Sequence, residues 1–415
     1  MDNFKLAHNR RSPYPVRARI SYQYLLLIPF FVNPLITIFF LTIHLIKQEE
    51  KNETLLYLLY FLISIYLGLI KTTIVPESDL LNYKRYFEQA SYLGVYDYIA
   101  YHPQETVFYL GTYFCNKLFW GNFKLYVILF TFIQYYLMFI SIHKYWRTND
   151  KSLILFAVIL FAIFNRYFFA SSHLVRQILA GSIFIYFFIT RIVDKKTYWW
   201  LIPIVFLIHS SSIVLLLLSF IPLLGQKISV KNVIIISFLV IGAIVFGNYA
   251  INFLDSLTKG ISFLNYPFQR FYSMELLEHS WYTGDSVGSL RYWYYVQLFP
   301  ILLFAYFFTK GKAPFYAILH LTIAILLLLE IFVFSGLLFM QMRLIYFLYL
   351  TVPFVYPLLF VKNNLYESKA FELFGMAFIF SWFIYRLMKN FTDGSIKFAS
   401  LTEFVINPVP LYFMN

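Results

Sequence analysis

Charged residues are scarce in this 415-residue chain. They make up 13% of it, against about a quarter in an ordinary soluble domain. Hydrophobic residues make up 60% and aromatic residues 22%. A soluble globule of this composition would expose a large part of its apolar surface to water. The composition therefore excludes a soluble domain and predicts an all-α protein that crosses the lipid bilayer many times.

The sequence also lacks the motifs of several enzyme classes. It contains no Walker loop, HExxH, GxSxG or paired CxxC motif, so nucleotide-dependent, zinc-dependent and serine-hydrolase chemistry is unsupported. Cys115 is the only cysteine, which excludes an intrachain disulfide. The first apolar run is too long for the core of a cleavable signal peptide. No cofactor and no metal is expected.

The net charge of +13 does not indicate nucleic-acid binding. A nucleic-acid footprint is a continuous basic face, whereas the basic residues here form short clusters between apolar runs. Such clusters are typical of cytoplasmic loops of membrane proteins.

Ten apolar runs approach the roughly 20 residues that a spanning helix needs. They are 25–46, 54–75, 123–145, 152–170, 174–193, 232–253, 291–309, 314–339, 343–361 and 370–388. With two ambiguous stretches, 104–120 and 197–224, this predicts about 10–12 transmembrane helices. Residues 1–24 form a basic N-terminal segment, 25–388 one membrane domain and 389–415 a tail. No internal repeat is evident, which argues against a secondary transporter.

Four basic clusters, at 144–151, 191–196, 227–231 and 310–312, should all lie in the cytoplasm. A single span at 197–224 would put the second and third on opposite sides. Two half-helices that turn near His209 and the serines at 210–212 would keep both inside, as a re-entrant hairpin. The alternative is one long helix with a polar kink.

The same reasoning places residues 76–122 and 254–290 outside. Residues 104–120 then form an amphipathic helix on the outer surface. If 54–75 and 25–46 each cross the membrane once, an outer segment at 76–122 also places the basic N-terminus outside. Either the charge rule is broken there, or 25–46 is another hairpin, broken at Asn33 and Pro34.

Polar residues near membrane depth are candidates for function. Asp79, Tyr83 and Tyr86 share one face of a predicted helix, and Asp79 could act as a base or simply cap that helix. His102 precedes Pro103, which can start a helix and place Glu105 in its first turn, where the helix dipole alone would explain the acid.

Further candidates lie at the outer ends of later runs. His173 and Arg176 are neighbours at helical i, i+3 spacing, followed by Gln177. An outer arginine needs an anionic partner, and its planar fork suits phosphate. His209 lies deep in an apolar run, where it could be functional or only hydrogen-bonded between helices. Arg343 is a second outer arginine, and Glu330 is its partner or a substrate contact.

These residues in this order resemble the EpsG family of bacterial exopolysaccharide and O-antigen polymerases. The matching pieces are DLLNYKRY (79–86), Glu105 before an aromatic helix, HLVRQILAGSIFIYFF (173–188), IHSSSIVLLLL (208–218) and Arg343 with Tyr346-Phe347. The resemblance covers about residues 54–360. More distantly, the chain looks like lipid-dependent glycosyltransferases with a GT-C fold, except that their HPP-like turn is HPQE here and their acid pair is reduced to Asp79.

The resemblance implies a polymerase of polyprenyl-diphosphate-linked oligosaccharide repeat units, on the outer face of the bacterial cytoplasmic membrane. Expected partners are the lipid-linked donor and acceptor, the bilayer and a chain-length regulator protein. Arg176 and Arg343, helped by His209, would hold the diphosphate, and Asp79 would deprotonate or orient the acceptor hydroxyl. The remaining expected substrate contacts are Tyr83, Glu105, His173, Gln177, Asp285 and Arg291. A transferase of single sugars from polyprenyl phosphate and a flippase of lipid-linked sugars are the alternatives.

Overall fold

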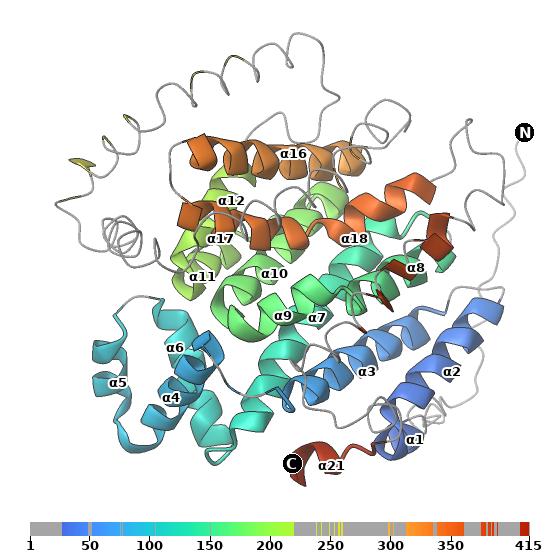
Figure 1. The fold of residues 1–415 in the computed structure, drawn as a ribbon, viewed down its shortest axis with the longest axis horizontal. Helices are drawn as coiled ribbons and strands as arrows, with labels where there is room; N and C mark the ends of the chain where they lie inside the picture. Colours follow the sequence, from blue (N-terminus) through green and yellow to red (C-terminus); the bar gives the residue numbers. More distant parts are fainter. Residues whose placement is uncertain are drawn as a thin grey trace, which may run out of the picture.

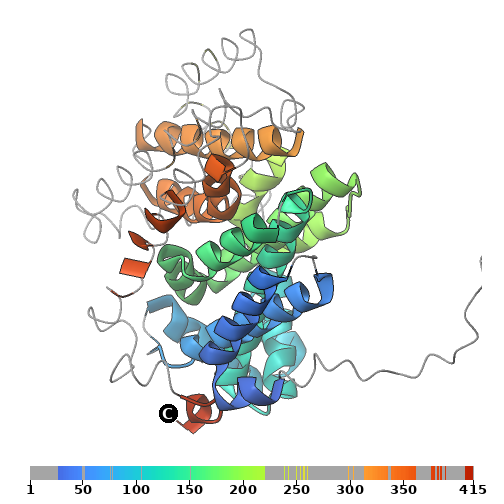
Figure 2. The same cartoon turned by 90° about the vertical axis from the view of Figure 1, so that its right-hand side faces the viewer.

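A computed structural model describes most of the chain outside residues 1–26, 220–312 and 361–406, within which only isolated positions are placed. The described residues are all helical or connecting, without strands, as the composition predicted. The helices pack into one bundle (Figures 1 and 2). In chain order they are α1 (Leu27–Val32), α2 (Pro34–Lys47), α3 (Glu53–Lys71), α4 (Ser78–Tyr92), α5 (Val95–Tyr101), α6 (Thr106–Leu118), α7 (Phe123–Trp146), α8 (Lys151–Ala162), α9 (Asn165–His173), α10 (Val175–Ile189) with η2 (Thr190–Asp194), α11 (Leu201–Ile208), η3 (Ser210–Ser212), α12 (Ile213–Ser219), α16 (Ala313–Phe334), α17 (Leu338–Tyr349), α18 (Val352–Val355), η4 (Tyr356–Phe360) and α21 (Leu411–Met414).

Three helices start at an asparagine whose side chain caps them. The side-chain oxygens of Asn33, Asn52 and Asn122 accept backbone N–H groups of the first turns of α2, α3 and α7 at 2.9–3.3 Å. Such bonds satisfy donors that have no partner within the helix. The polar residues that precede the apolar runs therefore fix where these helices begin.

Helices α3 and α7 pack together at the centre of the bundle. A Cβ on Gly68 would lie 3.0 Å from the Cα of Ile128, so glycine is what permits this approach. With α10 and η2, which form one continuous helix, they are the three described helices long and apolar enough to cross a membrane. They confirm the spans predicted at 54–75, 123–145 and 174–193.

Two predicted spans are bent pairs of helices rather than straight spans. α8 and α9, which together cover the span predicted at 152–170 and end at His173, meet at 52°, and the helices of 343–361 meet at 41°. If each pair counts as one span, the described residues contain five. The second bend lies just before Pro353, which cannot donate an N–H to a preceding turn.

Of the remaining predicted spans, one is broken, one forms a helix and three lie almost wholly outside the described residues. Residues 25–46 are broken at Asn33, where α1 ends and α2 begins, as one alternative required. Most of 314–339 forms α16. The spans predicted at 232–253, 291–309 and 370–388 lie almost wholly outside the described residues, as does the loop at 254–290.

Residues 76–122 form three helices, α4, α5 and α6, beside the end of α3 and the start of α7 (Figure 1). The last, α6, corresponds to the amphipathic helix predicted at 104–120. Its sequence alternates between residues that pack inward, such as Phe108 and Thr112, and exposed ones, such as Phe114 and Leu118. Its position on an outer membrane surface stays a prediction.

The first two basic clusters meet at the opposite end of the bundle. Asp194 accepts a hydrogen bond from Lys144 at 2.7 Å and from Arg147 at 2.8 Å. This contact places clusters 144–151 and 191–196 at one end of the bundle, as the charge argument required. Which side of a membrane that end faces stays a prediction.

The stretch 197–224 is broken at His209, as predicted. His209 has an extended backbone between α11 and η3. The chain enters this stretch from the C-terminal end of α10, and Ser219 returns there, because its carbonyl accepts a hydrogen bond from Arg191 at 3.1 Å. Arg191 lies about 20 Å along the helix from Arg176, near which His209 lies. These contacts fit a hairpin and disagree with one long kinked helix.

Candidate functional site

Arg176 lies in the first turn of α10 and is the centre of the site. Its Nη1 is ion-paired with Glu105 and donates to the Tyr109 hydroxyl at 3.1 Å, and its Nε donates to the Tyr83 hydroxyl at 3.4 Å. The guanidinium also lies over the rings of Tyr83, Phe108 and Tyr109, at 5.5–5.9 Å from their centroids. The anionic partner that an arginine at this depth requires is thus a carboxylate of the protein.

Glu105 bridges Arg176 and His209. One carboxylate oxygen is paired with Arg176 Nη1 and the other with His209 Nδ1. The helix begins at Thr106 rather than at Pro103, and Glu105 precedes it in the left-handed region, with φ 59°, without capping it. Placement in the first helical turn was therefore wrong. A non-glycine residue holds this conformation at a cost, which the contacts with Arg176 and His209 offset here.

His209 is brought to Glu105 by the break between α11 and η3. Ser212 fixes this break, because its hydroxyl lies 2.6 Å from the His209 carbonyl and 3.0 Å from that of Val205. Both His209 and Ser212 are buried. The polar residues in the apolar run therefore terminate one helix, start the next and orient the imidazole.

Arg343, on α17, joins the site through Gln177. Its Nη1 donates to Gln177 Oε1 at 3.0 Å, and Gln177 Nε2 donates to the Arg343 carbonyl at 2.6 Å. Gln177 is 1% exposed, so it acts as a support that positions Arg343. Arg176 and Arg343 both act electrostatically on His209. The two arginines that the sequence predicted at the outer side are thus neighbours of one histidine.

An aromatic wall surrounds the Arg176 side of the site. The His102 ring stacks on Tyr109 at 3.9 Å, with the two planes 6° apart, and Tyr86 and Tyr98 meet its edge. Burial and the Arg176 charge lower the pKa of His102, so this ring is neutral at pH 7. Burial raises the pKa of Tyr83 and Tyr109, so both phenols keep their protons.

The other predicted site residues are placed differently. Asp79 lies half-buried in the first turn of α4, four residues before Tyr83, so the predicted shared helix exists. His173 ends α9, and a break at Leu174 separates it from Arg176, so the predicted helical i, i+3 relation between them was wrong. Asp285 and Arg291 lie outside the described residues.

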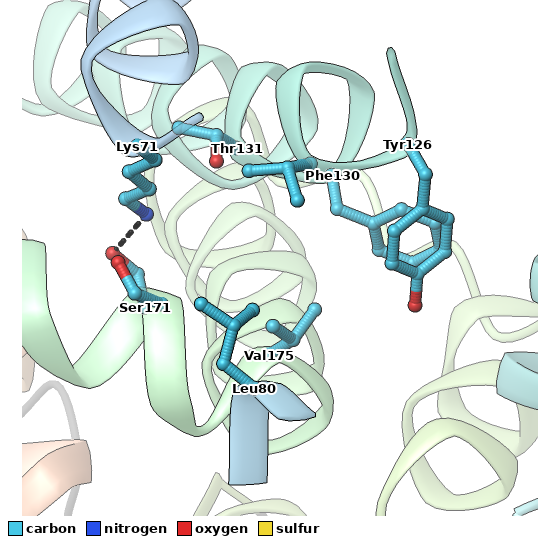
Figure 3. Close-up of a pocket in the computed structure, with 9 residues that line it drawn as sticks. Lys71, Leu80, Tyr126, Phe130, Thr131, Ser171 and Val175 are labelled. Carbon is cyan, nitrogen blue, oxygen red and sulfur yellow. Dashed lines mark hydrogen bonds between the residues drawn. The ribbon is translucent and has the colours of Figure 1, made fainter. Parts of the chain in front are cut away.

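One buried lysine was missed in the sequence. Lys71, the last residue of α3, is 2% exposed, and its Nζ donates to the Ser171 hydroxyl at 2.5 Å across a small cavity (Figure 3). Leu80 and Val175 line the same cavity, so it lies directly beneath the first turns of α4 and α10. An ionisable residue at the end of an apolar run was the available signal.

These features define a helical membrane protein with a buried Arg–Glu–His cluster at one end of its bundle. The comparison with protein families then identifies the group. The chain matches the EpsG family model over residues 75–402 and belongs to that family. No curated protein and no solved structure matches it significantly.

Proposed function

We propose that this protein joins polyprenyl-diphosphate-linked oligosaccharide repeat units into a polysaccharide, on the outer face of a bacterial cytoplasmic membrane. Membership of the EpsG family supports a polysaccharide polymerase-like activity. The observation that carries the proposal is the convergence of Arg176, Glu105, His209 and Arg343 at the N-terminal end of α10.

The arginines suit a diphosphate leaving group. Glycosyl transfer breaks the bond between the anomeric carbon and a phosphate oxygen, and the diphosphate leaves with the electron pair. Fixed guanidinium groups stabilise that developing charge. Because the Tyr83 and Tyr109 hydroxyls accept from Arg176, each keeps its own proton to donate to a substrate oxygen. The buried Glu105 keeps Arg176 in place between substrate turnovers.

The acceptor hydroxyl must lose a proton as it attacks. Asp79 lies on the helix that carries Tyr83 and is half-buried. A carboxylate there can take the proton or orient the hydroxyl, and its negative charge serves either role.

The position of the cluster suits a lipid-linked substrate. It lies at the end of the bundle opposite the Lys144–Asp194 contact, which is the cytoplasmic end if the basic clusters follow the usual charge rule. The lipid tail would lie in hydrocarbon while the diphosphate reaches the interfacial arginines. The donor and the growing acceptor then meet outside the membrane.

The test is the conversion of purified lipid-linked repeat units by the purified protein in detergent. We expect a ladder of longer glycans, which Arg343→Gln abolishes and Lys84→Ala, at an exposed position on α4, leaves intact. Transfer of single sugars from polyprenyl phosphate, or movement of lipid-linked units across reconstituted vesicles without elongation, would overturn the proposal.

A further inference from the structure

We propose that His209 is the base that removes the acceptor proton, with Glu105 as its orienting carboxylate. This inference rests on the proposed glycosyl transfer. It assigns proton removal to the imidazole and leaves Asp79 the task of orienting the acceptor.

The hydrogen bond to Glu105 determines which nitrogen can act. Glu105 faces the Arg176 guanidinium through its other oxygen, which favours the ionised carboxylate. An ionised carboxylate only accepts hydrogen bonds, so Nδ1 of His209 must carry the proton of that bond. In the neutral imidazole, Nε2 is then a bare lone pair. This is the protonation state that a general base requires.

Nε2 is also the nitrogen that has no partner among the described residues. His209 is 7% exposed, and its Nε2 is buried with no hydrogen bond to any residue that the structure describes. Buried polar atoms are nearly always paired in folded proteins. A substrate hydroxyl that donates to Nε2 would supply the bond.

The charges around His209 suit a base, because they act against an imidazolium before substrate binds and can stabilise it once substrate is bound. Among the described residues, the titratable and charged groups that act on His209 are Glu105, Arg176 and Arg343. The two guanidinium groups disfavour an imidazolium before substrate binds, so the ring stays available as a base. A bound diphosphate would offset their charge, and Glu105 would stabilise the imidazolium as it forms.

The backbone holds the ring rigidly. His209 lies at the break between α11 and η3. The Ser212 hydroxyl stabilises this break, because it donates to the carbonyls of Val205 and His209. The side chain of Asp79, by comparison, makes no hydrogen bond or ion pair to any other described residue. A base works best when a second group fixes its orientation, and Glu105 gives His209 that support.

The proposed step balances as follows. The acceptor oxygen forms a bond to the anomeric carbon of the donor and passes its proton to Nε2. The bond from that carbon to the diphosphate oxygen breaks, and the electron pair leaves with the diphosphate lipid. The imidazolium later returns the proton to solvent or to the released diphosphate.

The experiment measures single-turnover elongation of lipid-linked units at saturating substrate, between pH 5 and 9. For the wild type we expect a rate that falls in acid as one group becomes protonated. His209→Gln should lower this rate about 10²–10⁴-fold, with KM little changed. The fall of the rate in acid, the acid limb of the profile, should then be absent. Glu105→Gln should lower the rate but keep an acid limb. Lys84→Ala, at an exposed position on α4, is the control, with the rate and the acid limb of the wild type.

A cavity variant keeps the test decisive. In His209→Gly, added imidazole should restore part of the rate, and a structural role would show no such rescue. Elution profiles confirm that each variant is folded. A near wild-type rate in His209→Gln, or a rise in KM that accounts for the whole loss, would overturn the base assignment. A wild-type protein that makes no ladder would instead overturn the proposed function.

Discussion

The buried pair of Arg176 and Glu105 gives a stability prediction with a built-in control. The two side chains are 14% and 6% exposed. Removing one partner of a buried ion pair leaves an unpaired charge and costs about 3–5 kcal/mol. Arg176 keeps its bonds to Tyr83 and Tyr109 when Glu105 is replaced. We therefore expect Glu105→Leu to lower the free energy of unfolding by about 3 kcal/mol, the lower end of that range.

The double variant isolates the pair itself. Arg176→Met alone should cost a similar amount, because it leaves Glu105 with only His209. Arg176→Met/Glu105→Leu removes both charges and should cost about 2–3 kcal/mol less than the sum of the single variants. Tryptophan fluorescence during SDS unfolding from detergent micelles measures the free energy of unfolding. It is compared for the wild type, the two single variants and the double variant.

The reference is an exposed pair in the neighbouring helix. Lys84 and Glu88 lie 3.8 Å apart on α4, with side chains 42% and 56% exposed. Exposed helical pairs couple by about 0.3–0.5 kcal/mol. If the coupling between Arg176 and Glu105 is no larger than that between Lys84 and Glu88, the buried pair does not stabilise the site as argued here.

Arg176→Lys should retain little polymerase activity in the ladder assay, because an ammonium cannot bond Glu105 and both phenols in one plane; near-normal ladders would contradict this. Asp79→Asn should slow elongation about 100-fold if the carboxylate orients the acceptor, whereas a helix-capping aspartate would lose almost nothing, since asparagine caps as well. Cysteines introduced at Lys195 and Lys227 in a cysteine-free background should both resist an impermeant reagent in whole cells, and labelling at 227 alone would exclude the hairpin. His102 has a lowered pKa in the fold, so the unfolded chain binds its proton first, and stability should fall as the pH drops below about 6.5; His102→Asn should flatten that slope.

The long helices followed from the sequence because their causes are local. The apolar runs at 54–75, 123–145 and 174–193 are each long enough to span hydrocarbon, and asparagines cap two of them. The break at His209 was also local, since three serines and a histidine interrupt an apolar run. The bends between helices could not be predicted from local sequence. The angle between α8 and α9 depends on what packs against them, and their composition is that of one span.

The sequence could not predict which residues of the site contact one another. Glu105 and His209 are separated by 104 residues, and Gln177 and Arg343 by 166. Each is a reasonable candidate alone, but apolar runs do not specify which helix ends meet. Glu105 also had a sufficient local explanation as a helix-terminal acid, and only its left-handed backbone and its contacts with Arg176 and His209 showed otherwise.

Local patterns in the sequence were enough to predict that this protein crosses a membrane, where its main helices lie and which polar residues interrupt them. They were enough because hydrophobic length and helix capping act over a few neighbouring residues. The tertiary structure alone decided that Arg176 is paired with a carboxylate, that this carboxylate holds His209, and that Gln177 positions Arg343. Those contacts depend on how distant helices pack, which no local pattern encodes.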